Sequence, residues 1–406
     1  MKKIAKIFLQ IPALLVLIVL WILRPVVKIE LCIVAFHRFG HLALEPEIYL
    51  GELEIRAAQR DRGRFPITVQ WWSLGPKNKQ ANRYLATKWK QAIRVIPSWW
   101  IDALHSVGTK ISVLRLAEPH MSIRGSLNSL DRTDAQLELT DTEIAEGMSQ
   151  LRAIGVNPDH PYACLVVRDG GYYASLGEKE SDGYSFLNFD ISTFEQAALS
   201  LVQRGYQVIR MGAGSAATFG AGHPSVIDYA NSNLRSEFLD IYIAATCSFA
   251  ISTQTGPDAV CLAFRRPVCY IDVTRFSQFF FGTKLAWWNP AELWQGDSRL
   301  TLRDILRGPI FWIKDPNDFI REGIRQVRSS AERIDQLVMS FVDAFEKGMT
   351  QSNDQAKFTE RVQLCISSLI GERGRVEFGK IDAVVNSTFI NDYGYWISLI
   401  DKECNE

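Results

Sequence analysis

The chain has 406 residues, 47% of them hydrophobic, a length and composition that predict a globular protein of two domains. Its 45 basic and 45 acidic side chains cancel, so there is no electrostatic footprint for DNA or RNA, and nucleic acid is not an expected partner. The seven cysteines include no CxxC pair and no Cys/His cluster with zinc-like spacing. They indicate small buried residues in a reducing compartment.

Residues 1–28 form an apolar segment flanked by basic residues. Within residues 7–23 the one polar side chain is Gln10, and three lysines precede the run while Arg24 follows it. As a helix, the run is about 25 Å long, marginally enough to cross a membrane. No small-x-small cleavage pattern follows it, which disfavours a signal peptide. We expect membrane attachment, as a transmembrane helix or, because Pro12 interrupts the run, as a shallow interfacial helix.

A first α/β lobe is expected over residues 29–156. Continuous apolar runs predict buried strands, and helical periodicity with a capping box at residues 140–143 predicts helices. Strands are predicted at residues 29–36 and 67–74, a loop at 37–44, and helices at 45–60, 80–95 and 140–155.

A linker with two prolines at residues 157–161 separates a second α/β lobe, residues 157–317, in which strands and helices alternate regularly. Short loops between alternating elements require a parallel sheet with right-handed crossovers. Strands are predicted at residues 162–168, 207–212, 247–252 and 267–271, and helices at 192–205, 234–241 and 258–264. Residues 318–406 are expected to form C-terminal helices packed across the lobes, a long one within 318–349 and another at 358–370.

Two arginines follow predicted strands of the second lobe, where open parallel sheets bind ligands. Arg168 precedes Asp169, and Arg210 precedes Gly212. A guanidinium group can hold a phosphate through two parallel hydrogen bonds, which predicts an anion site. The alternatives are that Arg168 caps carbonyl groups or pairs with Asp169, and that Arg210 forms an interlobe salt bridge.

A third strand end combines hydroxyl groups with a glycine just before a predicted helix. It contains Thr253, Thr255, Gly256 and Asp258. The N–H groups that open the helix would point at a bound phosphate, so we expect an anion cradle. The alternative is that the loop only caps the helix.

A fourth strand end lies in the first lobe and carries His41. A histidine with a near-neutral pKa can remove a proton from an attacking hydroxyl group, which makes His41 a candidate general base. Glu45 is a rival base or the group that orients His41, and a purely structural histidine is the alternative. The sequence has no dinucleotide fingerprint, phosphate loop, nucleophile elbow or Asp-x-Asp metal pair, so neither a cofactor nor a metal is expected.

The chain resembles bacterial glycosyltransferases of surface-polysaccharide gene clusters, which have two Rossmann-like lobes in a GT-B-like arrangement. The resemblance is strongest over residues 160–275 and thin elsewhere. The matching segments are residues 40–43, 167–169, 208–212, 227–230 and 237–256. The arginines at the strand ends also resemble, more distantly, those of O-fucosyltransferase-like enzymes, where such an arginine binds the donor diphosphate. Leu187-Asn188 departs from the Arg-Asn expected there, so no phosphate role is expected for that loop.

The resemblance implies a metal-independent glycosyltransferase that uses a nucleotide-sugar donor. Arg168 and Arg210 would hold the donor phosphates, and His41 would lie with the acceptor. Thr253, Thr255 and Gly256 would line the phosphates, while Asp228 or Asp240 would be structural or lie near the ribose.

The expected acceptor is lipid-linked or a polysaccharide at the bacterial inner membrane, with the lobes in the cytoplasm, where nucleotide sugars are found. Two alternatives stay open: transfer of pyruvyl or another non-sugar group onto polysaccharide, and a membrane-attached scaffold without catalysis. The expected fold is thus α/β, with two lobes, an N-terminal membrane-associated helix and C-terminal helices.

Overall fold

The computed structural model of the protein forms two compact units, Met1–Ile123 (unit 1) and Arg124–Glu406 (unit 2). The residues that the structure describes are 2–59, 66–119, 121, 127–171, 188–215, 217–220, 222–274, 283–301, 304–305, 310, 317–349, 351–357, 359–360 and 384–385.

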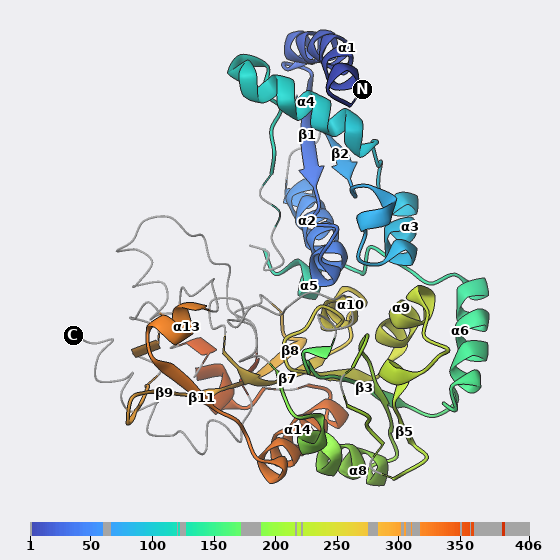
Figure 1. Ribbon diagram of the computed structural model, residues 1–406, viewed down its shortest axis with the longest axis vertical. Helices are drawn as coiled ribbons and strands as arrows, with labels where there is room; N and C mark the ends of the chain where they lie inside the picture. Colours follow the sequence, from blue (N-terminus) through green and yellow to red (C-terminus); the bar gives the residue numbers. More distant parts are fainter. Residues whose placement is uncertain are drawn as a thin grey trace. The chain divides into compact units, whose positions relative to one another are not determined.

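Unit 1 is built on two parallel strands, β1 (Val27–Ile33) and β2 (Ile67–Ser73). Its helices are α1 (Lys2–Leu23), α2 (Phe39–Gln59), α3 (Arg83–Ala92) and α4 (Ser98–Lys110), with the 3-10 helices η1 (Lys77–Lys79) and η2 (Ser112–Leu114). Helix α1 lies beside α4, and both share an apolar core with β1 (Figure 1). The predicted loop at residues 37–44 instead contains the first turn of α2, and α4 has no counterpart among the predicted elements.

Helix α1 differs from the expected transmembrane helix. Across the described residues, none of the helices has both the length and the apolar character needed to cross a membrane, which corrects that prediction. Pro12 lies inside α1, and one face of the helix packs into the core of unit 1. On that face Ala13 and Leu17 are 0% and 1% exposed.

Unit 2 contains a sheet with the strand order β12-β8-β7-β6-β3-β4-β5. Every neighbouring pair is parallel, which confirms the predicted parallel sheet. The strands are β3 (Tyr162–Val166), β4 (Gln207–Arg210), β5 (Val226–Ile227), β6 (Phe249–Ser252), β7 (Val268–Val273), β8 (Ala286–Pro290) and β12 (Val384–Val385). The chain places β4 and β5 on one side of β3, then crosses over to place β6, β7 and β8 on the other. The strand order therefore reverses between β3 and β6.

Helices cover both faces of this sheet (Figure 1). One face carries α8 (Glu195–Gln203), entered through the 3-10 helix η4 (Ile191–Phe194), and α14 (Ala331–Glu346). The other carries α9 (Glu237–Thr246) and α10 (Asp258–Ala263). Under α14 the core is aromatic: the ring of the fully buried Phe341 lies 5.3 Å from that of Phe249 and 5.7 Å from that of Trp287.

The boundary between the units lies upstream of the linker predicted at residues 157–161. The segment before that linker packs on unit 2, which explains the difference. Helix α6 (Asp141–Ala153) contacts α9, and α5 (Ser129–Arg132) places the Asp131 carboxylate to accept hydrogen bonds from Thr283 Oγ1 at 2.6 Å and the Lys284 backbone N–H at 2.9 Å. Unit 2 thus begins well before its first strand.

The C-terminal region contains the long amphipathic helix predicted within residues 318–349, which is α14. It is preceded by two short elements that were not predicted, α13 (Asn317–Arg321) and β11 (Ile324–Val327). Gly323, with a φ of +65°, follows α13, and Ser330 begins α14 by accepting a hydrogen bond from the Arg333 backbone N–H at 3.2 Å. Strand β11 pairs with β9 (Glu292–Gln295), which also pairs with β10 (Ser298–Arg299). Most of the predicted helix at 358–370 lies outside the described residues.

Candidate functional site

The candidate site of unit 2 lies at the carboxyl ends of β3 and β6, where the strand order reverses. At such a point the loops that follow the two strands diverge to opposite faces of the sheet, and the crevice between them is the usual ligand site of open α/β sheets. Arg168 follows β3 and Thr253 follows β6. The Arg168 backbone N–H donates to Thr253 Oγ1 at 3.0 Å, so the structure brings these two predicted residues together.

The side chain of Arg168 is half-buried and extends from the end of β3 toward Asn188. Its Nε donates to Asn188 Oδ1 at 3.1 Å. The backbone N–H of Phe189 in turn donates to the Arg168 carbonyl oxygen at 2.8 Å. These bonds hold the guanidinium group at the edge of the sheet and in partial contact with solvent.

Arg210 has different surroundings from those expected for a phosphate ligand. Its side chain is fully buried, and Nη2 donates to Asp169 Oδ2 at 2.9 Å while Nη1 lies 3.5 Å from Asp228 Oδ1. Nη1 also donates to the carbonyl oxygen of Ala217 at 2.6 Å. The interlobe salt bridge considered as the alternative for Arg210 is not among these contacts, since every one of these partners belongs to unit 2. Arg210 therefore ties the loops after β3, β4 and β5 together.

Gly212 follows Arg210 in a tight part of this loop. A Cβ atom there would lie 3.2 Å from Ser215 Oγ and 3.4 Å from the Ala230 Cβ. The residue thus lets the chain turn closely around the buried arginine.

The loop after β6 is organised by the carboxylate of Asp258, the first residue of α10. Asp258 Oδ2 accepts hydrogen bonds from Ser252 Oγ at 2.5 Å and from the Thr255 backbone N–H at 2.9 Å. Burial raises the pKa of Asp258 to about 6, against the effect of these hydrogen bonds. The carboxylate thus takes up an N–H group that the anion-cradle prediction assigned to a phosphate.

Three other features of this loop bear on its predicted role. Gln254 has a φ of +64°, an uncommon conformation for a residue with a side chain. The Thr255 hydroxyl is buried without a hydrogen-bond partner in the described structure. Gly256 begins the turn into α10, because its carbonyl oxygen accepts from the Ala259 backbone N–H at 3.3 Å. The loop combines a strained backbone with an unsatisfied hydroxyl group next to Arg168.

Arg328, between β11 and α14, is a site residue that the sequence prediction missed. Its Nη2 donates to the Asn188 carbonyl oxygen at 2.7 Å, and its Cζ lies 3.7 Å from the centre of the Phe189 ring. Asn188 therefore joins Arg328 to Arg168. Burial lowers the pKa of Arg328, with the Asp272 carboxylate acting in the opposite direction. The available sequence signal is an arginine just before the Ser-Ser start of an amphipathic helix.

A cavity lies close to Arg328, beyond the carboxyl end of β8. Its volume is about 280 Å³. It is lined by Asn289, Pro290, Glu292, Val327, Arg328, Ser329, Ser330, Arg333 and Leu337. Ser329, in the wall of the cavity, is held in place because its backbone N–H and its hydroxyl donate to the two carboxylate oxygens of Asp272 at 2.8 and 2.7 Å. The cavity adds a polar recess at the same edge of the sheet as Arg168.

In unit 1, His41 and Glu45 lie one turn apart near the start of α2. His41 Nδ1 lies 2.7 Å from Glu45 Oε1, and Glu45 Oε2 accepts the Ala35 backbone N–H at 2.8 Å. The Glu45 side chain is 8% exposed and that of His41 29%. Of the two roles considered for Glu45, the geometry matches the one that orients His41, since the buried carboxylate holds the imidazole at Nδ1.

No protein-family model matches this sequence, and the comparison with curated proteins gives no match. Among solved structures, the chain is similar to ADP-heptose LPS heptosyltransferase II of E. coli, with 12% identity, a TM-score of 0.35, and 60% of this chain and 84% of that one covered. A glycosyl transferase of family 9 from Veillonella parvula has 10% identity and a TM-score of 0.41, over 76% and 97% of the two chains. The iron-containing heptosyltransferase TibC has 12% identity and a TM-score of 0.35, over 80% and 77%.

Proposed function

We propose that the protein is a glycosyltransferase that moves a sugar from a nucleotide-sugar donor to a lipid-linked or polysaccharide acceptor. The observation that carries the proposal is the hydrogen-bonded junction of Arg168 and Thr253 at the reversal of strand order in unit 2. That a sugar is the transferred group rests on the sequence resemblance over residues 160–275.

In the proposed site, the donor diphosphate lies at the edge formed by Arg168, Thr253 and Arg328. A guanidinium group forms strong, paired hydrogen bonds with phosphate oxygens. Arg328 is partly desolvated, and a desolvated cation interacts more strongly with an arriving anion than an exposed one. Arg210 takes a positioning role, because its guanidinium is fully buried against Asp169 and Asp228.

The proposed reaction displaces the nucleoside diphosphate from the anomeric carbon of the sugar. The acceptor oxygen forms a bond to that carbon as the carbon–oxygen bond to the diphosphate breaks, and the acceptor proton goes to His41. Because Glu45 engages Nδ1, the proton-accepting atom is Nε2. The arginines stabilise the negative charge that develops on the leaving diphosphate.

The setting of the reaction is part of the same proposal. We place the enzyme at the inner membrane of a bacterium, with its catalytic residues in the cytoplasm, and we propose that it needs no metal or cofactor. The arginines of the site support this last point, because they supply positive charge where a metal ion would otherwise do so. Transfer of a non-sugar group such as pyruvyl and a scaffold role are the competing functions.

The test is a titration of the full chain with nucleoside mono- and diphosphates and their sugars. One nucleotide class is expected to raise the unfolding temperature, because a ligand at 100 times its dissociation constant adds about 2.7 kcal/mol of stability. Arg168→Ala is expected to weaken that binding by roughly 10- to 100-fold, since a hydrogen bond to a charged group contributes about 1.5–3 kcal/mol.

Arg204→Ala is the matched control for Arg168→Ala. Arg204 also belongs to unit 2, but it lies at the end of α8, before β4 begins, and pairs with Asp343 and Glu346. Its removal is expected to leave nucleotide affinity unchanged. If folded protein binds no nucleotide, or if the two variants lose affinity equally, the proposed donor site is wrong. A pyruvyl transferase or a scaffold would then be the better hypothesis.

A further inference from the structure

Large apolar side chains exposed to solvent are concentrated in unit 1. The structure has 17 such residues among those it describes, and only Ile144, Leu199, Leu234 and Ile320 belong to unit 2. Seven of the others lie on α1 itself. Scattered exposed apolar residues are normal in a folded protein, whereas a concentration on one element marks an interaction surface.

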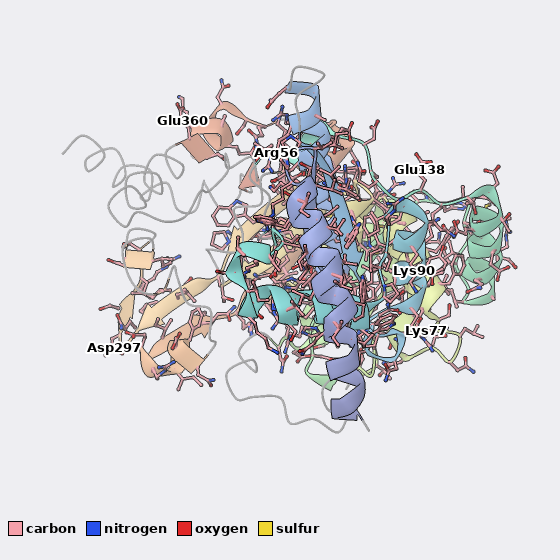
Figure 2. The ribbon with its side chains drawn as sticks, turned by 90° about the horizontal axis from the view of Figure 1, so that it is seen from above. Arg56, Lys77, Lys90, Glu138, Asp297 and Glu360 are labelled. Atoms are coloured by element: carbon pink, nitrogen blue, oxygen red, sulfur yellow. The ribbon has the colours of Figure 1, made fainter. Side chains whose placement is uncertain are left out.

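Helix α1 has two distinct faces. Ala13 and Leu17 are buried in the core that α1 shares with α4 and β1. The α1 face, defined as Ile11, Leu15, Ile18, Val19 and Ile22, is 37–62% exposed. Four of these residues follow the helical spacing of three or four positions, so they form one continuous stripe. In Figure 2, which looks onto the side of α1, no other element of unit 1 is drawn over this helix.

The surroundings of the α1 face are basic. Residues 1–29 contain five lysines and arginines and no acidic residue. Lys110 Nζ donates to Gln10 Oε1 at 3.4 Å, which places one further cation beside α1, and Arg24 Nη2 donates to the Arg115 carbonyl oxygen at 2.5 Å. Asp102 is the one acidic residue of α4. Positive charge around an apolar stripe complements an anionic surface and repels a second copy of the same stripe.

We propose that α1 lies in the plane of an anionic lipid bilayer and inserts the α1 face among the lipids while its other face stays packed in unit 1. This is the geometry of an interfacial amphipathic helix, in which apolar insertion and attraction to anionic lipids act together. The exposed Trp21, at 46%, lies near the end of the helix, where an indole suits the headgroup region. The proposal does not depend on the reaction that the protein catalyses.

Flotation of the full chain with lipid vesicles tests this proposal. Vesicles of phosphatidylcholine alone are compared with vesicles that also contain phosphatidylglycerol. The chain is expected to bind the anionic vesicles, and binding is expected to fall about tenfold or more at 1 M salt, where the Debye length is about 3 Å. The variant Ile11→Glu/Leu15→Glu/Ile22→Glu is expected to bind at least about a hundredfold more weakly, because three inserted side chains become charged.

The matched control is Ile144→Glu/Leu234→Glu/Ile320→Glu, which changes net charge equally but alters exposed residues of unit 2. It is expected to bind like the unchanged chain, and circular dichroism checks that both variants are folded. An equal loss in both variants, or no vesicle binding at all, overturns the proposal. The proposal is also overturned if the chain does not bind vesicles but forms a dimer that the α1 variant abolishes. Retention on vesicles after an alkaline carbonate wash would instead indicate a spanning helix and would also overturn it.

Discussion

Arg168 follows β3 and Arg210 is the last residue of the neighbouring strand β4, yet their guanidinium groups have different surroundings. Arg168 is half-buried beside Asn188, whereas Arg210 is fully buried with Asp169 and Asp228 close to it. A buried cation whose partners are carboxylates has a structural role, because it neutralises charges that would otherwise be costly to bury. The two arginines should therefore respond differently to substitution.

Arg210→Met is predicted to lose about 3–5 kcal/mol of unfolding free energy, because it removes the buried guanidinium charge that lies against the largely buried carboxylates of Asp169 and Asp228. Urea unfolding measures this value. Arg204→Ala, which removes an exposed ion pair, is the control and should cost about 0–1 kcal/mol. Adding Asp169→Asn and Asp228→Asn to Arg210→Met should restore part of the lost stability. An Arg210→Met variant as stable as the control would refute the structural role.

Sequence reasoning places a residue at a strand end more reliably than it assigns the partners of that residue. The junction of Arg168 with Thr253 follows from the alternation of strands and helices, because parallel strands bring their carboxyl ends to one edge. The pairing of Arg210 with Asp228 joins loops after different strands and is set by tertiary packing. Arg328 was missed for the same reason, since its place beside Asn188 depends on contacts across 140 positions of the chain.

At the scale of elements, the contact between α6 and α9 attaches the segment before the first strand to unit 2. Gly147 lies in the middle of α6, and a Cβ atom there would come within 2.2 Å of the Tyr242 ring on α9. Tyr242 is itself 3% exposed, so the ring has little room to move. The glycine permits the two helices to approach closely.

Gly147→Ala tests this close approach. Alanine normally favours a helix over glycine by about 1 kcal/mol, but overpacking against a buried ring costs about 1–3 kcal/mol. We therefore predict a net loss of stability, measured by urea unfolding. In the background of Tyr242→Ala the ring is absent, and the same substitution should become stabilising. If Gly147→Ala stabilises the protein in both backgrounds, α6 does not pack on α9 as described.

The elements that the sequence predicts well are those with a local signal. The capping box at Thr140 and Glu143 begins α6 as predicted, with the Glu143 backbone N–H donating to Thr140 Oγ1 at 3.3 Å. Strand β11 was not predicted, because its pairing with β9 lies outside any local window. The predicted linker at residues 157–161 and the start of unit 2 at Arg124 differ, because the helical periodicity of α6 carries no local signal for the surface on which the helix packs.

At the scale of the whole molecule, each unit has its own apolar core. One core contains α1, α4 and β1 of unit 1, and the other contains the sheet, α8 and α14 of unit 2. Chains with separate cores often unfold in more than one step. We predict two thermal transitions in calorimetry, which substitutions in the two cores can assign to the units.

Leu104→Ala in unit 1 and Phe341→Ala in unit 2 should each lower one transition and leave the other unchanged. Both side chains are buried, and such truncations cost about 2–5 kcal/mol. If the donor site lies in unit 2 as proposed, a bound nucleotide should raise the transition that Phe341→Ala lowers and leave the other in place. A nucleotide that raised only the transition sensitive to Leu104→Ala would move the donor site to unit 1. A single transition lowered by both substitutions would show that the two cores unfold together.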